Sequence, residues 1–91
     1  MRFYHGTSVS GLKEILPPTE TNIFREDSRT GFLDCVFVTP IRKSAEMYAR
    51  KCAQKFGGDP IVYEVEPVNP SEINVSQYIC DRAIVLGTIK I

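Results

Sequence analysis

Residues 34–58 read DCVFVTPIRKSAEMYARKCAQKFGG and carry the strongest secondary-structure pattern of the chain. Positions 34–39 are mostly β-branched or aromatic, a composition typical of a buried strand. Thr39 offers a helix-capping hydroxyl, and Pro40 suits the first helical position, where its missing N–H is not needed. Apolar residues, Tyr48 among them, then recur with the helical period on the face expected to pack in the core, as far as Phe56, and Gly57–Gly58 ends the pattern. We therefore predict a buried strand followed directly by an amphipathic helix.

The segments before this unit predict a strand, a helix and a loop. Residues 2–5 are rich in aromatics and end at Gly6, which indicates a short strand. Residues 8–16 begin with serines that can cap a helix, place leucine and isoleucine on one face, and are followed by two prolines. Residues 19–33 are polar and without period. A loop of about 15 residues is uncommon in a small domain unless it is functional.

The segments after the helix predict strands. Residues 61–66 alternate apolar and polar, residues 67–81 form an irregular stretch with one short strand at 73–75, and residues 83–91 form a last strand interrupted by Gly87. This order contains too few strand–helix–strand units for a doubly wound sheet. We predict an α+β fold in which two helices pack on small twisted sheets.

The totals predict one domain spanning residues 1–91, because a chain of 91 residues is too short for two. Eleven basic and eleven acidic residues give zero formal net charge, which argues against non-specific binding to nucleic acid or to an anionic membrane. No apolar stretch is long enough to span a bilayer.

The three cysteines, at irregular spacing, predict reduced thiols in a reducing compartment, the cytoplasm. Cys35 and Cys52 fall inside apolar patterns, so we predict buried packing residues and no metal site formed by the cysteines with the single histidine. Cys80 lies in the irregular stretch and is expected to react with thiol reagents.

His5, Gly6 and Thr7 at the end of the first predicted strand are the candidate binding residues. Gly6 leaves the backbone bare, so a planar ligand could approach its N–H and C=O groups, and Thr7 adds a hydroxyl. Such a group suits an amide-bearing ring and its ribose. A plain glycine turn is the alternative for so short a motif.

Residues 4–7, Tyr-His-Gly-Thr, resemble the first-strand motif of the ADP-ribosyltransferase fold. The order and spacing are most similar to the rifampicin-modifying ADP-ribosyltransferases, with a weaker likeness to the poly(ADP-ribose) polymerases. Further similar stretches follow in the same order, at residues 18–24 (PTETNIF), 36–39 (VFVT), 44–49 (SAEMYA), 61–67 (IVYEVEP) and 84–87 (IVLG). The resemblance therefore runs over nearly the whole chain.

This resemblance implies an ADP-ribosyltransferase-like fold of small, split, twisted β-sheets. It also implies a mono-ADP-ribosyltransferase that uses NAD as co-substrate, cleaves the nicotinamide–ribose bond and transfers ADP-ribose to an unidentified acceptor, a small molecule or a protein. His5 would hold a ribose hydroxyl, and the Gly6 backbone would bond the nicotinamide amide beside Thr7. Phe37 would stack on nicotinamide, where the rifampicin-modifying group has tyrosine. Because Phe37 lies in an apolar strand, a packing role in the core is the alternative.

In such proteins an acidic residue orients the ribose and supports the charge that grows in the transition state. Gln77 is nearest to this position, and Glu72 and Asp81 are neighbouring alternatives. Glutamine is uncharged and a poor base. The resemblance therefore also admits a catalytically degenerate module that binds NAD or ADP-ribose, or another protein. A likeness to RNA 2′-phosphotransferases lacks the basic residues that such an enzyme needs around its site.

The polar loop 19–33 falls where the family places a loop that contacts the NAD donor. Asn22 and Arg25 are the cofactor-binding candidates that the resemblance places there, and Arg25 or Arg29 could pair with the pyrophosphate.

Overall fold

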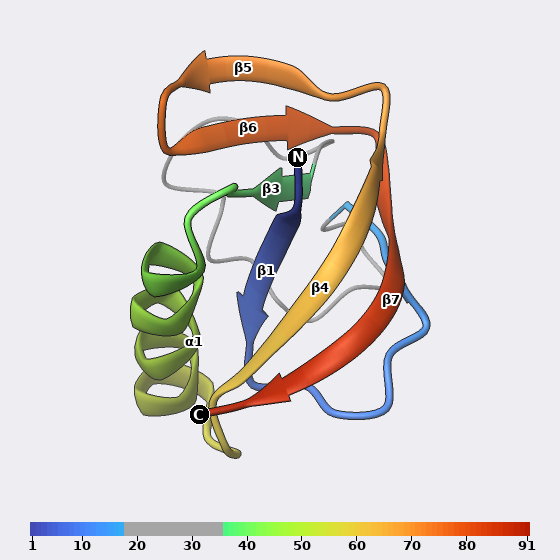
Figure 1. Ribbon diagram of the computed structural model, residues 1–91. Coiled ribbons are helices and arrows are strands. Elements are labelled where there is room, and N and C mark those ends of the chain that lie inside the picture. Colours follow the sequence, from blue (N-terminus) through green and yellow to red (C-terminus); the bar gives the residue numbers. More distant parts are fainter. Residues whose placement is uncertain (18–35) are drawn as a thin grey trace.

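The computed structural model describes residues 1–17 and 36–91, which form an α+β fold with one helix and two antiparallel sheets (Figure 1). The predicted fold class is confirmed at this level. In chain order the elements are β1 (Phe3–Thr7), β2 (Glu14–Ile15), β3 (Val36–Val38), α1 (Arg42–Phe56), β4 (Ile61–Val68), β5 (Ser71–Asn74), β6 (Gln77–Cys80) and β7 (Arg82–Lys90).

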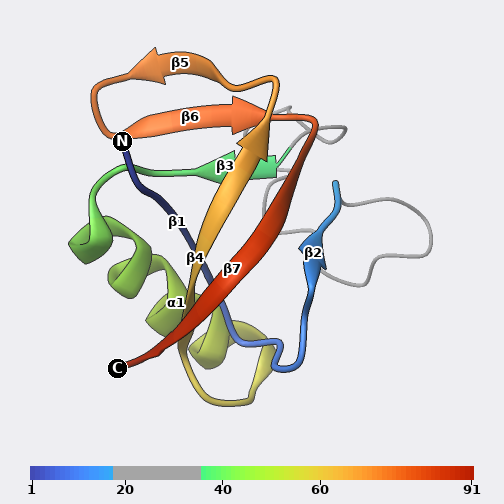
Figure 2. The same ribbon diagram turned by 45° about the vertical axis from the view of Figure 1, so that its right-hand side comes forward.

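The larger sheet has the order β1-β4-β7-β2, and the smaller one the order β3-β6-β5. The long strands β4 and β7 form the middle of the larger sheet, and their register shifts between Glu64 and Val65. Figures 1 and 2 show the small sheet lying across one end of the large one, with α1 running beside β1. Residues of both sheets pack between them.

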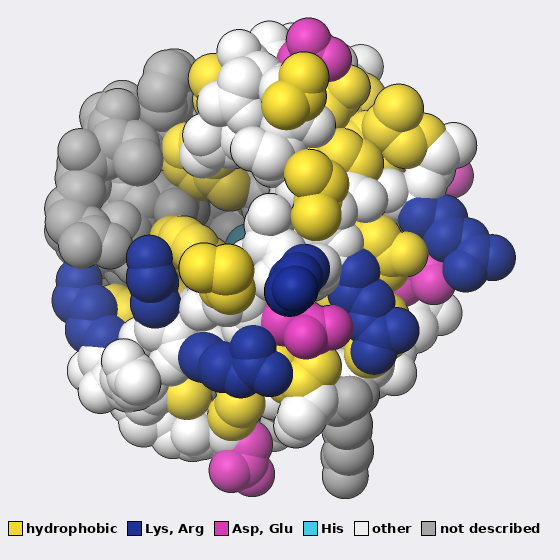
Figure 3. Space-filling model, turned by 60° about the vertical axis from the view of Figure 1, so that its left-hand side comes forward, with side chains coloured by type: hydrophobic (Ala, Val, Ile, Leu, Met, Phe, Trp, Pro, Cys, Tyr) yellow, Lys and Arg dark blue, Asp and Glu magenta, His cyan; other side chains and the backbone are white. Residues whose placement is uncertain are grey.

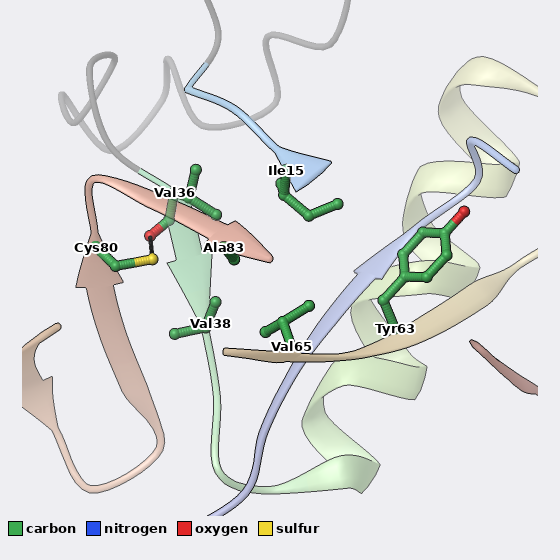
Figure 4. Close-up of a cluster of buried hydrophobic side chains, with 7 residues drawn as sticks. All are labelled: Ile15, Val36, Val38, Tyr63, Val65, Cys80 and Ala83. Carbon is green, nitrogen blue, oxygen red and sulfur yellow. Dashed lines mark hydrogen bonds between the residues drawn. The ribbon is translucent and has the colours of Figure 1, made fainter. Parts of the chain in front are cut away.

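Two buried clusters hold these layers together. The first joins the two sheets and consists of Ile15, Val36, Val38, Tyr63, Val65, Cys80 and Ala83 (Figure 4). The second lies between α1 and the large sheet and consists of Ala45, Ala49 and Val62. Small residues on the buried face of α1 allow the helix to approach the sheet closely, because alanine adds little bulk at the contact.

Gly6 is the point of closest approach between β1 and α1. A Cβ atom built at Gly6 would collide with the carbonyl oxygen of Ala45 and would lie 2.8 Å from the backbone nitrogen of Ala49. The sequence predicts that a ligand approaches the bare backbone of Gly6. In the structure, α1 fills the space that a side chain at Gly6 would occupy. Helix packing is thus a sufficient reason for glycine here.

The helix predicted over residues 8–16 is wrong, and the described residues contain one helix instead of two. Residues 14 and 15 form β2 and pair with Ile84 and Ala83 of β7, and the backbone N–H of Val85 donates to the carbonyl oxygen of Lys13 (3.0 Å). Pairing with the edge of β7 satisfies the backbone groups of this segment, whereas a short isolated helix would be only marginally stable. Tertiary contacts therefore override the local pattern.

Tyr63 holds the segment before β2. Its hydroxyl donates to the carbonyl oxygen of Val9 (2.6 Å) and accepts from the backbone N–H of Leu12 (3.3 Å). The phenol thus takes up backbone polar groups that a helix would otherwise have paired internally.

The main helix is confirmed, but it begins at Arg42, two residues later than expected. Its N-cap is Ile41, with no side-chain cap bond, while the Thr39 hydroxyl accepts from the backbone N–H of Ile41 (3.0 Å). Thr39 therefore closes a turn before the helix. Among the described residues no helix is long and apolar enough to cross a membrane.

The stretch predicted to be irregular, residues 67–81, instead continues β4 to Val68 and then forms the β5–β6 hairpin. The strand expected at residues 73–75 overlaps the end of β5 at residues 73 and 74, beside a register shift between Glu72 and Asn74, and residue 75 belongs to the turn that follows. The hairpin is fixed by pairing of β6 with β3, a contact between segments far apart in sequence that local periodicity does not reveal.

Of the predictions for the two described cysteines, one is confirmed and the other is wrong. Cys52 is buried, with 3% of its surface exposed, as predicted. Cys80 is also only 3% exposed, and its Sγ lies 3.6 Å from the carbonyl oxygen of Val36 (Figure 4), so the expectation of a reactive Cys80 is wrong. Cys35 lies outside the described residues.

Replacing Gly6 with alanine is expected to destabilise the fold by about 3 kcal/mol, the upper end of the usual overpacking cost, because the colliding atoms belong to backbone. Gly87→Ala is the matched control, since a Cβ there meets nothing within 4 Å. Its free energy of unfolding should change by no more than about 0.5 kcal/mol. Thermal unfolding of the two variants measures the difference. Equal unfolding temperatures would contradict the close approach.

Native-state labelling tests the burial of the thiols. Cys52 and Cys80 should react slowly with a maleimide, because the reagent reaches them only through opening of the core. Peptide mass spectrometry after a short pulse reads each site separately, with the denatured protein as the control. Rapid labelling of Cys80 in the folded protein would contradict its burial.

Candidate functional site

A pocket of about 210 Å³ opens where the edge of β1 meets β3, the start of α1 and the β5–β6 turn. Figure 3 shows it as a hollow, with cyan atoms of the single histidine, His5, visible inside. The residues that line it are Tyr4, His5, Gly6, Phe37, Val38, Thr39, Ser44, Ala45, Tyr48, Ser76 and Gln77.

The edge of β1 brings backbone groups into this pocket. The Tyr4 N–H donates to the carbonyl oxygen of Thr39 (2.8 Å), and the Thr39 N–H donates back to Tyr4 (2.9 Å), so the Tyr4 backbone groups point away from β4. Backbone groups alternate in direction along an antiparallel strand. Those of Gly6, two residues on, therefore point to the same edge, and Gly6 lines the pocket. One donor and one acceptor thus stand side by side in the cleft.

His5 is oriented by β3. Its Nδ1 lies 2.8 Å from the carbonyl oxygen of Phe37. A carbonyl oxygen only accepts, so Nδ1 carries the proton, and in the neutral ring the lone pair is on Nε2. The bond fixes the ring plane and joins β1 to β3 at the pocket wall.

Helix α1 contributes a hydroxyl and an aromatic ring that the sequence analysis missed. Ser44 and Tyr48 are four residues apart, so they lie on one side of the helix, and both line the pocket. Tyr48 was assigned to the apolar core face, whereas it is only partly buried. The signal that could have found them is a serine and an aromatic at this spacing, directly after the strand that carries Phe37.

The β5–β6 turn contributes Ser76 and Gln77, and the two candidate carboxylates lie elsewhere. Glu72 accepts a hydrogen bond from the Tyr78 hydroxyl (2.8 Å), and Asp81 accepts one from the Asn69 amide (2.9 Å). Of the three candidates for the acidic position, the structure brings only Gln77 to the pocket. The described residues that line the pocket include no carboxylate.

The remaining predicted site residues are not assembled with these. Thr7 is 4% exposed and does not line the pocket, and its hydroxyl accepts from the backbone N–H of Val9 (3.3 Å). Asn22, Arg25 and Arg29 lie outside the described residues. The structure therefore brings together His5, Gly6, Phe37 and Gln77 from the sequence-based set, and adds Ser44 and Tyr48.

This arrangement suits a flat ligand with polar edges. Phe37 and Tyr48 offer aromatic surface, the β1 edge offers a backbone donor and acceptor, and the Ser44 hydroxyl can do either. Among residues 1–17 and 36–91 there is no cluster of three or more His, Cys, Asp or Glu side chains that could hold a metal ion.

Comparisons with known proteins returned no match: no family model, no curated protein and no solved structure is similar to this chain.

The hairpin that carries Gln77 is held by a bond that pH should break. The hydrogen bond from the Tyr78 hydroxyl to Glu72, with smaller effects from desolvation and from the carboxylate charge, raises the pKa of Tyr78 above the ordinary 10.0. The bond needs the neutral phenol, so its contribution to stability is present below pH 10 and is lost as pH rises through the higher pKa. In Glu72→Gln the pKa of Tyr78 should fall. Ultraviolet titration measures the pKa of Tyr78. Subtracting the titration curve of Tyr78→Phe removes the contribution of the other tyrosines. An unchanged pKa would contradict the pairing.

Proposed function

We propose that this protein binds NAD with the nicotinamide end in the pocket and transfers ADP-ribose to an acceptor, on an ADP-ribosyltransferase-like arrangement of split sheets. The supporting observation is convergence. Four residues that the resemblance names, from positions 5, 6, 37 and 77, lie on three different strands and line one pocket. A chance likeness of scattered motifs gives no reason for them to meet.

The size of the pocket supports a ring-sized occupant. Pockets for drug-sized ligands span roughly 300–1,000 Å³, and this one has about 210 Å³. The space suits nicotinamide, with the remainder of the dinucleotide outside the pocket.

Each lining group has a matching part of the ligand. The nicotinamide carboxamide has one acceptor and one donor face, which the N–H and C=O groups of Gly6 complement. The hydroxyl of Ser44 can add a third bond to the carboxamide. Phe37 and Tyr48 supply aromatic surface for the pyridinium ring, and the positive charge of that ring favours contact with aromatic faces. His5 stands beside them to bond a ribose hydroxyl.

The reaction breaks the bond between ribose C1′ and the nicotinamide nitrogen. The bonding electron pair leaves with nicotinamide, and C1′ takes on oxocarbenium character. A nucleophilic atom of the acceptor then bonds to C1′, and its proton passes to water. The Gln77 amide oxygen would accept a hydrogen bond from the ribose 2′-hydroxyl, which orients the sugar without supplying a full negative charge.

A second candidate is an NAD-binding module that does not turn NAD over. The observation that favours it is the neutral side chain of Gln77 at the position where the chemistry prefers a carboxylate. Pre-placed negative charge near a developing cation is usually the largest single contribution to catalysis of this kind.

Calorimetry with NAD, together with a search for nicotinamide release, tests the proposal. Wild-type protein should bind NAD and release nicotinamide. His5→Ala should weaken NAD binding by about 1–3 kcal/mol. Gln77→Glu should accelerate release on the order of 100-fold, since a carboxylate supports the cation. Glu66→Gln, at an exposed carboxylate that does not line the pocket, is the control and should match wild type in both measurements.

The outcomes separate the two candidates. NAD binding without release, followed by release in Gln77→Glu, identifies the non-catalytic module. No heat and no thermal shift with NAD or nicotinamide would overturn both candidates. Nicotinamide release that is unchanged in both His5→Ala and Gln77→Glu would place the chemistry elsewhere.

A further inference from the structure

Helix α1 concentrates positive charge on a chain whose formal net charge is zero. It carries five basic residues and one acidic residue, a net charge of +4, so the rest of the chain carries −4. All five basic residues are exposed, namely Arg42, Lys43, Arg50, Lys51 and Lys55. We call them the α1 basic face. In Figure 3 the Lys and Arg side chains gather below the hollow, on the side where α1 lies.

Among residues 1–17 and 36–91, few side chains neutralise this charge. Arg42 and Arg50 share the single acidic residue of the helix, Glu46, at 3.1 and 3.9 Å, and about half of each arginine side chain stays exposed. Lys43 and Lys51 form no ion pair with any other described residue. The zero net charge that argued against nucleic acid applies to the chain as a whole, whereas binding responds to local potential.

The α1 basic face adjoins the pocket. Ser44 and Tyr48 line the pocket, and Lys51 and Lys55 follow at seven and eleven residues from Ser44, so all four share one stripe of the helix. A polyanion that follows this stripe passes the mouth of the pocket.

We propose that the α1 basic face binds the phosphate backbone of single-stranded nucleic acid. Three of the five cations are lysines, which are depleted at protein–protein interfaces but are common phosphate ligands. Lys and Arg residues clustered along one helix are also the usual electrostatic footprint of a nucleic-acid partner. Met47, 56% exposed among these cations, gives an apolar surface against which a base can lie.

The curvature of the basic face selects a single strand over a duplex. At 100° per residue the five side chains spread over roughly 220° around the helix axis. A flexible single strand can bend around such a convex surface, while a duplex, stiff over about 150 base pairs, contacts only the side that faces it. A single strand can also turn a base or an end toward the mouth of the pocket, which a base held inside a duplex cannot do.

The docking stands independently of NAD, whereas a role for the strand as acceptor rests on the proposed function. In that role ADP-ribose is transferred to the bound strand. A nucleophilic oxygen or nitrogen of a base or terminus bonds to C1′ as nicotinamide leaves with its electron pair, and the proton of that atom passes to water.

Fluorescence anisotropy with a labelled oligothymidylate, without NAD and over a series of salt concentrations, tests the docking. The logarithm of affinity should fall with the logarithm of salt, by about 0.7 per phosphate contact. The double variant Lys51→Gln/Lys55→Gln should therefore lower the slope by about 1.4. The control Arg2→Gln/Lys13→Gln removes the same charge outside α1 and should leave the slope unchanged.

Four results would overturn the docking: no binding at low salt, equal loss in both double variants, equal competition by polyglutamate, and equal or tighter binding of a duplex of the same length. Polyglutamate competition would indicate an acidic protein partner instead.

Transfer of label from radiolabelled NAD to the strand tests the acceptor role. Label should appear with wild type and fall with Lys51→Gln/Lys55→Gln at unchanged NAD affinity. Nicotinamide release without labelled strand would overturn the acceptor role alone. Strand binding without NAD binding would overturn the proposed function and leave the docking intact.

Discussion

Helix α1 lies so close to β1 that the carbonyl oxygen of Ala45 takes the place of a side chain at Gly6. This contact sets the height of the helix above the sheet, and hence the distance from the β1 edge to Ser44 and Tyr48. A larger residue at Gly6 would force the helix away from β1 and widen the pocket at the same time. Stability and site geometry therefore depend on one residue without a side chain.

The pocket lies on the seam between the two sheets. Hydrogen bonds between described residues cross this seam, among them the pair between Tyr4 and Thr39 and the bond from His5 to the Phe37 carbonyl. His5 is thus part of the wall as well as a candidate ligand contact. The strand predicted to end at His5 runs on to Thr7, so His5 lies in the middle of β1, and its bond to β3 helps to hold it in place although β1 is an edge strand of the large sheet.

The α+β class and the main helix could be predicted from sequence, because apolar residues from Ala45 to Cys52 repeat with the helical period. The strand β2 could not, since residues 14 and 15 owe their conformation to pairing with β7. The buried position of Cys80 follows from pairing of β6 with β3, again a distant contact.

The candidate site shows the same division. His5, Gly6 and Phe37 stand out through a motif and its order along the chain. The choice among Glu72, Gln77 and Asp81 depends on hairpin register, which the sequence leaves open. Tyr48 reads as core, because helical period alone does not distinguish a ring facing the interior from one facing a cleft.

The uneven distribution of charge also governs how the protein behaves in concentrated solution. With +4 on one helix and −4 on the remainder of the chain, each molecule carries a concentrated positive charge that is balanced by negative charge elsewhere at neutral pH. The positive side of one copy attracts the negative part of another, and no net repulsion opposes their association. Added salt weakens this attraction. The protein should therefore salt in, with its lowest solubility in dilute buffer, which a chain of zero net charge and evenly mixed charges would not do.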